Sequence, residues 1–160
     1  MSKQAVFDIE EIRAIIARGK DLPGATLPIL HEIQDAVGYI PAEAVQLIAD
    51  ALNLSRAEVH GVITYYHHFR QQPAAKHVVK LCRAEACQAV GSEALAAHAK
   101  AKLGCDFHES SKDGMFTLEP VYCLGQCACG PAVMLNDADV HGRMTTAKFD
   151  ELLQELKAAK

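Results

Sequence analysis

Apolar residues in the first 75 positions recur at intervals of three and four, the spacing that gathers side chains on one face of an α-helix. The four runs with this spacing are Ile9, Ile12, Ile15 and Ile16; Leu27, Leu30, Ile33 and Val37; Ala44, Val45, Ile48 and Leu52; and Val59, Val62, Ile63 and Tyr66. The pattern predicts four amphipathic helices. Residues 1–75 are therefore expected to form a small helical bundle, in which packing explains the apolar faces better than a ligand site does.

Local signals predict where these helices begin and end. Asp8 with Glu11, and Ser55 with Glu58, have the spacing of a capping box. Pro41 suits the first turn of the third helix, where a missing backbone N–H costs nothing. Glycines suited to ending the first two helices follow their apolar runs, at Gly19 and Gly38.

The pattern changes after Pro73. Short β-branched or alternating runs predict strands over 77–82, 116–123, 132–135 and 138–144, the last two joined across Asn136 and Asp137. Helices are expected over Ser92–Leu103 and from Thr145 or Thr146 onward. The order strand, helix, strand, strand, strand, helix predicts an α/β fold. A thioredoxin-like topology over residues 76–160 is the simplest candidate.

Composition narrows the class of protein. The chain has 160 residues, a net charge of −4 and a pI near 6.0, whereas nucleic-acid binders normally carry a strongly basic face. No apolar run approaches the ~20 residues that span a bilayer, and the charged N-terminus lacks a signal-peptide pattern. We therefore expect a cytoplasmic protein without membrane insertion. In that reducing compartment six cysteines indicate metal binding or redox chemistry rather than disulfides.

Four of the cysteines form two pairs. Cys82 and Cys87 are separated by four residues, and Cys123 and Cys127 by three. Each pair opens where a predicted strand ends, and strand ends on one side of a parallel or mixed sheet are neighbours. Small residues in both loops allow the backbone to approach sulfur closely: Ala84, Ala86, Gly125, Ala128 and Gly130. The sequence therefore predicts a site with four thiolate ligands.

Two kinds of occupant suit such a site. Thiolates are soft ligands that match the iron of an iron–sulfur cluster, and the same four sulfurs suit a structural zinc ion. A plant-type ferredoxin is excluded because no third cysteine follows Cys87 at Gln88 to Val90, and a Rieske centre is excluded because neither loop contains histidine. A thiol–disulfide enzyme would need a Cys-x-x-Cys pair, which the chain lacks. Cluster and zinc both remain open on spacing alone.

The remaining candidate residues receive no role. Cys105 follows a glycine suited to ending a helix and is interpreted as a packing residue, and Cys129 stays unassigned beside the second pair. His60, His67 and His68 have no cysteine or carboxylate partners in a ligand pattern and are interpreted as surface residues. The chain also lacks nucleotide-binding and nucleophile motifs. It is therefore not expected to be catalytic alone, and an electron carrier of this kind needs partners that hold substrate and nucleotide.

The segment from LPILHEIQDAVGYI to VITYYHHF, followed by VKLCRAEAC and VYCLGQCACGPAVMLN, resembles the thioredoxin-like 2Fe–2S subunit of NADH:quinone oxidoreductase, the complex I family. The resemblance covers nearly the whole chain. The loops CRAEAC and CLGQCACGP look closest to the gamma subunit of soluble NAD-dependent formate dehydrogenase. NAD-reducing hydrogenases have similar subunits.

The resemblance implies one 2Fe–2S cluster per chain, with Cys82, Cys87, Cys123 and Cys127 as its ligands. It implies an N-terminal helical bundle followed by a thioredoxin-like 2Fe–2S ferredoxin domain. It also implies electron transfer in a diaphorase module, docked on a subunit that binds FMN and NAD, and in the formate enzyme a large subunit containing molybdenum or tungsten. A zinc-stabilised assembly module without redox activity is the alternative from another class.

Overall fold

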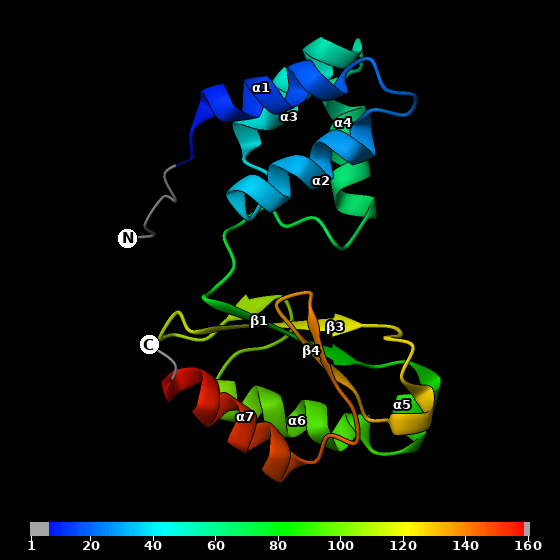
Figure 1. Cartoon of the computed structure of the whole chain (residues 1–160), viewed down its shortest axis with the longest axis vertical. Helices are drawn as coiled ribbons and strands as arrows, with labels where there is room; N and C mark the ends of the chain where they lie inside the picture. The colour runs from blue at the N-terminus through cyan, green and yellow to red at the C-terminus, as the bar shows by residue number, and fades with distance from the viewer. Residues whose placement is uncertain (1–6, 159–160) are drawn as a thin grey trace. The chain divides into compact units, whose positions relative to one another are not determined.

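The structure, a computed structural model, describes residues 7–158 of the chain. The chain divides into two compact units, Met1–Pro73 and Ala74–Lys160. In the first the described residues form helices alone, and the second holds a sheet with helices (Figure 1). Each unit has a hydrophobic core of its own. This confirms the expected order of a helical region followed by an α/β fold.

The helical unit contains the four predicted helices. They are α1 (Ile9–Gly19), α2 (Thr26–Val37), α3 (Ala42–Leu52) and α4 (Arg56–Tyr65). All four contribute fully buried side chains to one core, among them Ile12, Ile29, Leu30, Ile33, Ile48 and Val59. A Cβ added at Gly19 would lie 2.7 Å from the Ile29 side chain, so the absence of a side chain there lets α1 pack tightly on α2.

The helix ends follow the sequence signals only in part. Ser55 and Glu58 form the predicted capping box at the start of α4. Asp8 caps α1, but it accepts from the backbone N–H of Glu10 rather than forming the predicted box with Glu11. Pro41 is the N-cap of α3, one residue before the helix, because its ψ of 147° is extended. The prediction that placed Pro41 within the first turn was therefore wrong by one residue.

The chain leaves α4 earlier than the apolar spacing indicated. Tyr66 caps the helix with a ψ of 99°, and its side chain is 43% exposed instead of facing the core. Phe69 takes that inward place and is buried in the helical core. Gln34 of α2 fixes this segment, since its side-chain amide donates to the His68 carbonyl at 2.8 Å and accepts from the Arg70 backbone N–H at 2.7 Å.

The second unit has a mixed five-stranded sheet in the order β2-β3-β1-β4-β5. Its strands are β1 (His77–Cys82), β2 (Glu109–Ser110), β3 (Phe116–Val121), β4 (Val133–Leu135) and β5 (Asp139–His141). Its helices are α5 (Glu85–Ala89), α6 (Ser92–Leu103) and α7 (Thr146–Ala158), with a 3-10 helix, η1, over Cys127–Cys129. β1 pairs in parallel with β3 and antiparallel with β4. This topology agrees with the thioredoxin-like expectation.

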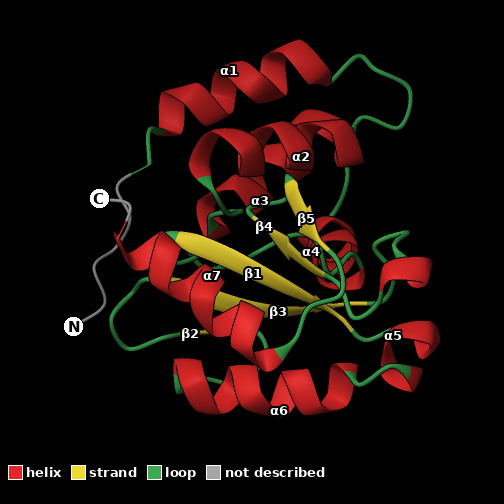
Figure 2. Cartoon of the chain, turned by 60° about the horizontal axis from the view of Figure 1, so that its bottom comes forward, coloured by secondary structure: helices red, strands yellow, loops and turns green. Residues whose placement is uncertain are grey.

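Both long helices of this unit, α6 and α7, lie against one face of the sheet (Figure 2). Their inward side chains, such as Leu95 and Phe149, meet Leu81 of β1 and Leu118 of β3 in a single core. Thr145 caps α7 by accepting from the backbone N–H of Lys148. This packing leaves the carboxyl ends of β1 and β3 to carry the cysteine loops.

The short elements were the hardest to predict. The strand expected over 116–123 ends at Val121, and the last strand covers only Asp139–His141. The turn at Asn136 and Asp137 is present, with positive φ of 50° and 60° that a tight hairpin requires. α5, β2 and η1 had no counterpart in the sequence prediction. Within residues 7–158, no helix is long and apolar enough to cross a membrane.

Candidate iron–sulfur site

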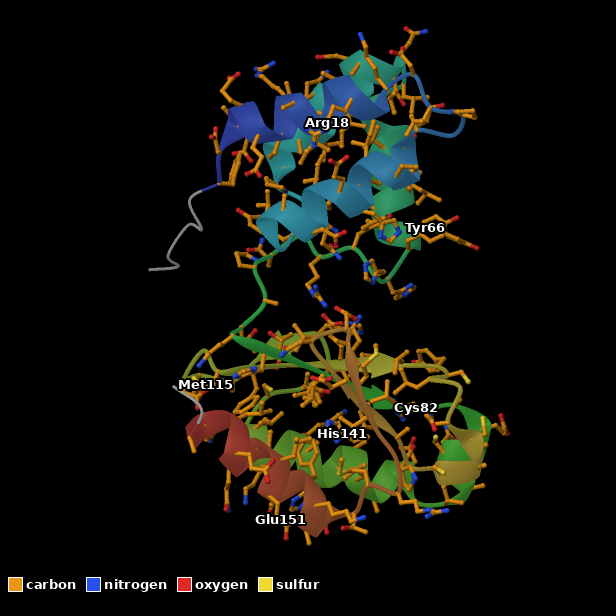
Figure 3. All side chains as sticks on the ribbon, in the orientation of Figure 1. Arg18, Tyr66, Cys82, Met115, His141 and Glu151 are labelled. Atoms are coloured by element: carbon orange, nitrogen blue, oxygen red, sulfur yellow. The ribbon has the colours of Figure 1, made fainter. Side chains whose placement is uncertain are left out.

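The sheet places the starts of the two cysteine loops side by side, at the carboxyl ends of β1 and β3. Cys82 is the last residue of β1 and stands in register with Val121, the last residue of β3. The backbone N–H of Arg83 donates to the Val121 carbonyl at 2.7 Å, so the two strands are still joined where they end. Figure 3 labels Cys82 at this end of the sheet, on the side of α5. The predicted neighbourhood of the two strand ends is thus confirmed.

The first pair of thiols is buried. Cys82 and Cys87 are each only 2% exposed, and they pack with Ala132 in a small apolar cluster. The Cys82 side chain raises the pKa of the Cys87 thiol and the backbone of Ala132 lowers it, so both act directly on the Cys87 sulfur. Ala132 is held in place because its carbonyl accepts from the Cys82 N–H at 3.0 Å. The short helix α5 therefore serves to turn Cys87 back towards Cys82.

The second pair lies at the surface. Cys123 and Cys127 are both exposed, and the Cys123 side chain raises the pKa of the Cys127 thiol. The backbone N–H of Gly125 points at the Cys123 sulfur, with 3.3 Å between nitrogen and sulfur. Gly125 has φ of 73°, a conformation that glycine adopts without strain. An N–H aimed at sulfur is the kind of contact that tunes iron–sulfur clusters.

The two pairs act on each other electrostatically. The pKa of the Cys87 thiol is raised mainly by burial, then by the hydrogen bond to Cys82, and Cys127 adds to the rise. The pKa of Cys127 is raised mainly by its hydrogen bond to Cys123, with a smaller contribution from Cys82. Thiolates crowded in this way repel one another. Binding a positively charged centre would relieve that repulsion and favour loss of the protons.

The donor set fits a two-iron cluster. Such a cluster takes four thiolates, two for each iron, and the four sulfurs form two neighbouring pairs, in the loops that follow β1 and β3. The backbone at Gly130 also lies close to the Cys87 sulfur. A Cβ added at Gly130 would lie 3.4 Å from that sulfur and 2.9 Å from Val90 Cγ2. Among residues 7–158, no three His, Cys, Asp or Glu side chains converge as ligands of one metal ion would.

The other two cysteines differ from the pairs in their role. Cys105 is buried in the core of the second unit, as expected of a packing residue, and burial raises the pKa of its thiol. Cys129 is partly exposed at the end of η1, where its carbonyl accepts from the Arg143 N–H at 2.5 Å. Its backbone thereby anchors the second loop to the segment before α7.

Sequence reasoning missed Ala132 and Gly142. Ala132 contacts the buried pair only because β4 inserts beside β1. A Cβ added at Gly142 would lie 2.8 Å from the Cys129 carbonyl oxygen, so this glycine permits the loop to sit against the strand end. Ala132 stood at the start of the predicted strand 132–135, whereas Gly142 lay inside the predicted strand 138–144, where nothing marked its contact with Cys129.

The fold and the paired thiols together define a thioredoxin-like protein with a four-cysteine site. The chain belongs to the thioredoxin-like [2Fe-2S] ferredoxin family, whose model matches residues 12–157. That family is defined by a 2Fe–2S cluster. The match covers both units, so the helical region is part of the family pattern and not an appendage.

Several curated relatives align over most of their own length. A subunit of the NADH-quinone oxidoreductase of Rhizobium meliloti (strain 1021) is 36% identical over 150 residues, covering 94% of this chain and 89% of the relative. The corresponding NADH-quinone oxidoreductase subunit of Escherichia coli (strain K12) is 34% identical over 138 residues, covering 86% and 82%. The HndA subunit of the NADP-reducing hydrogenase of Solidesulfovibrio fructosivorans is 31% identical over 156 residues, covering 96% and 91%.

A solved structure supports the fold. The crystal structure of an NAD+-reducing [NiFe]-hydrogenase in the air-oxidized state superposes with a TM-score of 0.70 at 23% identity. The superposition covers 89% of this chain and 24% of the hydrogenase chain. The same succession of helices and sheet therefore occurs within a longer polypeptide.

Proposed function

We propose that this chain is the 2Fe–2S electron-transfer subunit of a multisubunit NAD-linked oxidoreductase. The observation that carries the proposal is the pairing of four thiols at one edge of the sheet, in a chain of the thioredoxin-like [2Fe-2S] ferredoxin family. Cys82, Cys87, Cys123 and Cys127 would be the ligands. The cluster would supply one-electron chemistry, and the chain supplies the thiolates and the N–H of Gly125 directed at sulfur.

The parent complex is proposed at two levels. Relatives named as NADH-quinone oxidoreductase and NADP-reducing hydrogenase subunits favour a complex that exchanges electrons with NAD or NADP. The flavin-binding partner follows from the family resemblance. The finer hypothesis is formate dehydrogenase, which rests on the loop sequences CRAEAC and CLGQCACGP alone. In that case the partners include a subunit binding FMN and NAD and a large molybdenum- or tungsten-containing subunit.

Electron paramagnetic resonance on the anaerobically purified chain tests the cofactor. We expect no signal in the oxidised protein and about one spin per chain after dithionite, with about two irons and two sulfides. A colourless protein containing zinc would instead establish the assembly-module alternative. A sample that stays free of iron after anaerobic reconstitution with iron and sulfide would refute the proposal.

Single cysteine substitutions test the ligand set. Cys82→Ser, Cys87→Ser, Cys123→Ser and Cys127→Ser should each lose or strongly shift the cluster's visible absorption and resonance signal, because an alcohol is a poor replacement for a thiolate. Cys105→Ser is the matched control, since that thiol packs in the core of the second unit. Complete loss of the cluster in Cys105→Ser, with the fold intact, would overturn the assignment.

The parent reaction needs the native assembly. Affinity purification of the tagged chain from its own cells, followed by assays of NAD reduction with formate, with hydrogen and with no added donor, separates the candidates. Formate-dependent reduction establishes the finer hypothesis. Hydrogen-dependent reduction, or NADH oxidation by a quinone without either donor activity, assigns the chain to one of the other two complexes.

A further inference from the structure

Lys80 of β1 is buried although it carries a charge. It is 8% exposed, and among residues 7–158 it is the one charged residue less than 9% exposed. Lysine is almost never buried to this degree unless its charge is paired. Its ammonium group forms ion pairs with the carboxylates of Asp137 and Glu119, the second with 3.8 Å between nitrogen and oxygen. The second unit therefore contains a buried cation that two carboxylates hold in place.

This cation lies on the same face of the sheet as the first ligand thiol. Side chains alternate along a strand, so Lys80 and Cys82 point away from the core that contains Leu81. Glu119 stands in register with Lys80, as Val121 does with Cys82. The Cα atoms of Lys80 and Cys82 are about 6.6 Å apart at the usual rise of a strand. The buried ion pair thus immediately precedes the buried thiol along one face.

Stability alone is a weak explanation for this ion pair. Removing charges from water costs free energy that their mutual attraction often only offsets, so apolar side chains of similar size would stabilise the fold as well. An apolar side chain does occupy this face beside the pair, since Met134 of β4 stands in register with Lys80. What distinguishes the position of Lys80 is the thiol site at the end of the same strand.

We propose that the ammonium group of Lys80 raises the reduction potential of the cluster. The inference rests on the proposed function, since it requires a cluster bound through Cys82. Reduction adds one negative charge to a centre already surrounded by thiolates, and a nearby cation stabilises the more negative state. Glu119 and Asp137 keep the ammonium group in this position, while their own charges act in the opposite direction.

Coulomb's law gives the size of the effect. At an effective dielectric constant of about 20, two unit charges about 12 Å apart interact strongly enough to change an equilibrium constant about tenfold. The side chains of Lys80 and Glu119 are only 10% and 14% exposed, so dissolved salt screens them less than it screens a surface pair. Removing either charge should therefore change the ratio of oxidised to reduced cluster at a fixed potential.

A potentiometric titration of the purified full chain at pH 8, followed by electron paramagnetic resonance, measures this ratio. Lys80→Met should lower the potential by the equivalent of about a tenfold change, about 59 mV for a one-electron couple, and Glu119→Gln should raise it by a similar amount. Lys80→Arg keeps the charge and should stay within about twofold of the wild type. A general disturbance of the site would not change sign with the charge removed.

Lys102→Met and Glu151→Gln are the matched controls. They remove the same charges at exposed positions of α6 and α7, and should shift the ratio less than about twofold because water and salt screen them. If Lys80→Met binds no cluster, Glu119→Gln decides the question, since it leaves the ammonium group paired with Asp137.

The outcomes separate this inference from the proposed function. A cluster whose potential moves less than about twofold in Lys80→Met and Glu119→Gln, or moves in the same direction in both, would overturn the role of Lys80 and leave the proposed function intact. A wild-type chain that holds no cluster after reconstitution would overturn both.

Discussion

Small residues determine how closely the backbone approaches the four thiols. Gly130 lies against Cys87, and Gly142 lies against the backbone of Cys129, where an added Cβ would meet atoms at 2.8 and 2.9 Å. A clash with backbone is costlier than one with the tip of a flexible side chain, because the whole segment must move. The second cysteine loop is therefore more sensitive to Gly142 than its distance in sequence indicates.

Gly142→Ala should destabilise the protein by about 1–3 kcal/mol, the usual cost of overpacking, and should reduce the iron bound per chain. Urea denaturation and iron analysis measure the two effects. Gly61→Ala is the matched control, since nothing lies within 4 Å of its Cβ position inside α4. There alanine should stabilise the helix by about 0.5–1 kcal/mol. Full iron content and unchanged stability in Gly142→Ala would contradict this account.

At this scale the cysteine pairs were easier to recognise in the sequence than the residues that surround them. The four cysteines were recognisable because their spacing and their places after strands are local properties. Ala132 and Gly142 were not recognisable, since their contacts depend on which strand β4 pairs with. A short window of sequence does not determine which distant strand another strand pairs with, or in which register.

Single polar contacts join whole elements in both units. In the helical unit, the buried Gln34 connects α2 with the segment after α4 through both ends of its amide. In the second unit, Asp150 of α7 accepts from Lys102 and contacts His98, both on α6. These contacts connect elements that are distant in sequence, so their removal should lower the stability of the whole unit.

Gln34→Leu should lower the free energy of unfolding by about 1–3 kcal/mol. The leucine fills the space but leaves the His68 carbonyl and the Arg70 N–H without these bonds. Urea denaturation followed by far-ultraviolet circular dichroism measures the change. Gln46→Leu is a suitable control because Gln46 makes only an exposed bond to Asp50. An equal effect of the two substitutions would argue against the bridging role of Gln34.

Asp150→Asn should change the pH dependence of stability. The pKa of Asp150 is lowered first by the hydrogen bond from Lys102 and then by that with His98. A lowered folded-state pKa means that the carboxylate stabilises the fold above its ordinary pKa of about 3.9, and that this stabilisation disappears as the pH falls through the folded value. The urea midpoints of wild type and Asp150→Asn should differ at neutral pH and converge in acid.

Glu151→Gln serves as the control for that experiment. Glu151 is the next residue of α7, is exposed, and makes no ion pair within the described part of the chain. Its removal should leave the urea midpoint nearly unchanged across the same pH range. A difference between wild type and Asp150→Asn that persists undiminished in acid would contradict the electrostatic explanation.

Helices of several turns could be predicted from the sequence, and helices of a single turn could not. The four helices of the first unit repeat their apolar spacing over several turns, so the pattern outweighs local exceptions. α5 and η1 are each about one turn long and lack a period to detect. Tyr66 continued the helical spacing, but the chain had already turned, and Phe69 filled the place in the core.

The whole molecule combines two separate cores, and all four paired cysteines belong to the second unit. The helical core and the sheet core share no residue among those described. The sequence indicated this division through the loss of helical spacing at Pro73, since each core follows from its own pattern. Stability and cluster binding should therefore respond to substitutions in different units.

Ile48→Ala in the helical core should cost about 2–5 kcal/mol, because a fully buried side chain is removed. It should lower the midpoint of helix loss in far-ultraviolet circular dichroism, while the visible absorption of the cluster melts as in the wild type. Leu118→Ala, an equally buried position of β3, is the counterpart and should lower the midpoint of the visible transition. A loss of cluster absorption in Ile48→Ala at the same midpoint as helix loss would contradict independent unfolding.

The late position of β4 in the sequence determines when the thiol site can form during synthesis of the chain. β4 pairs with β1, and Ala132, the residue that precedes β4, packs on the buried thiols. The ribosome nevertheless makes β4 about fifty residues after β1. A nascent chain therefore completes its helical unit long before the pocket for sulfur exists. Binding of the proposed cluster would therefore follow synthesis of β4. A chain halted between β1 and β4 contains the residues of the helical unit and Cys82, but it lacks Ala132 beside the buried thiols.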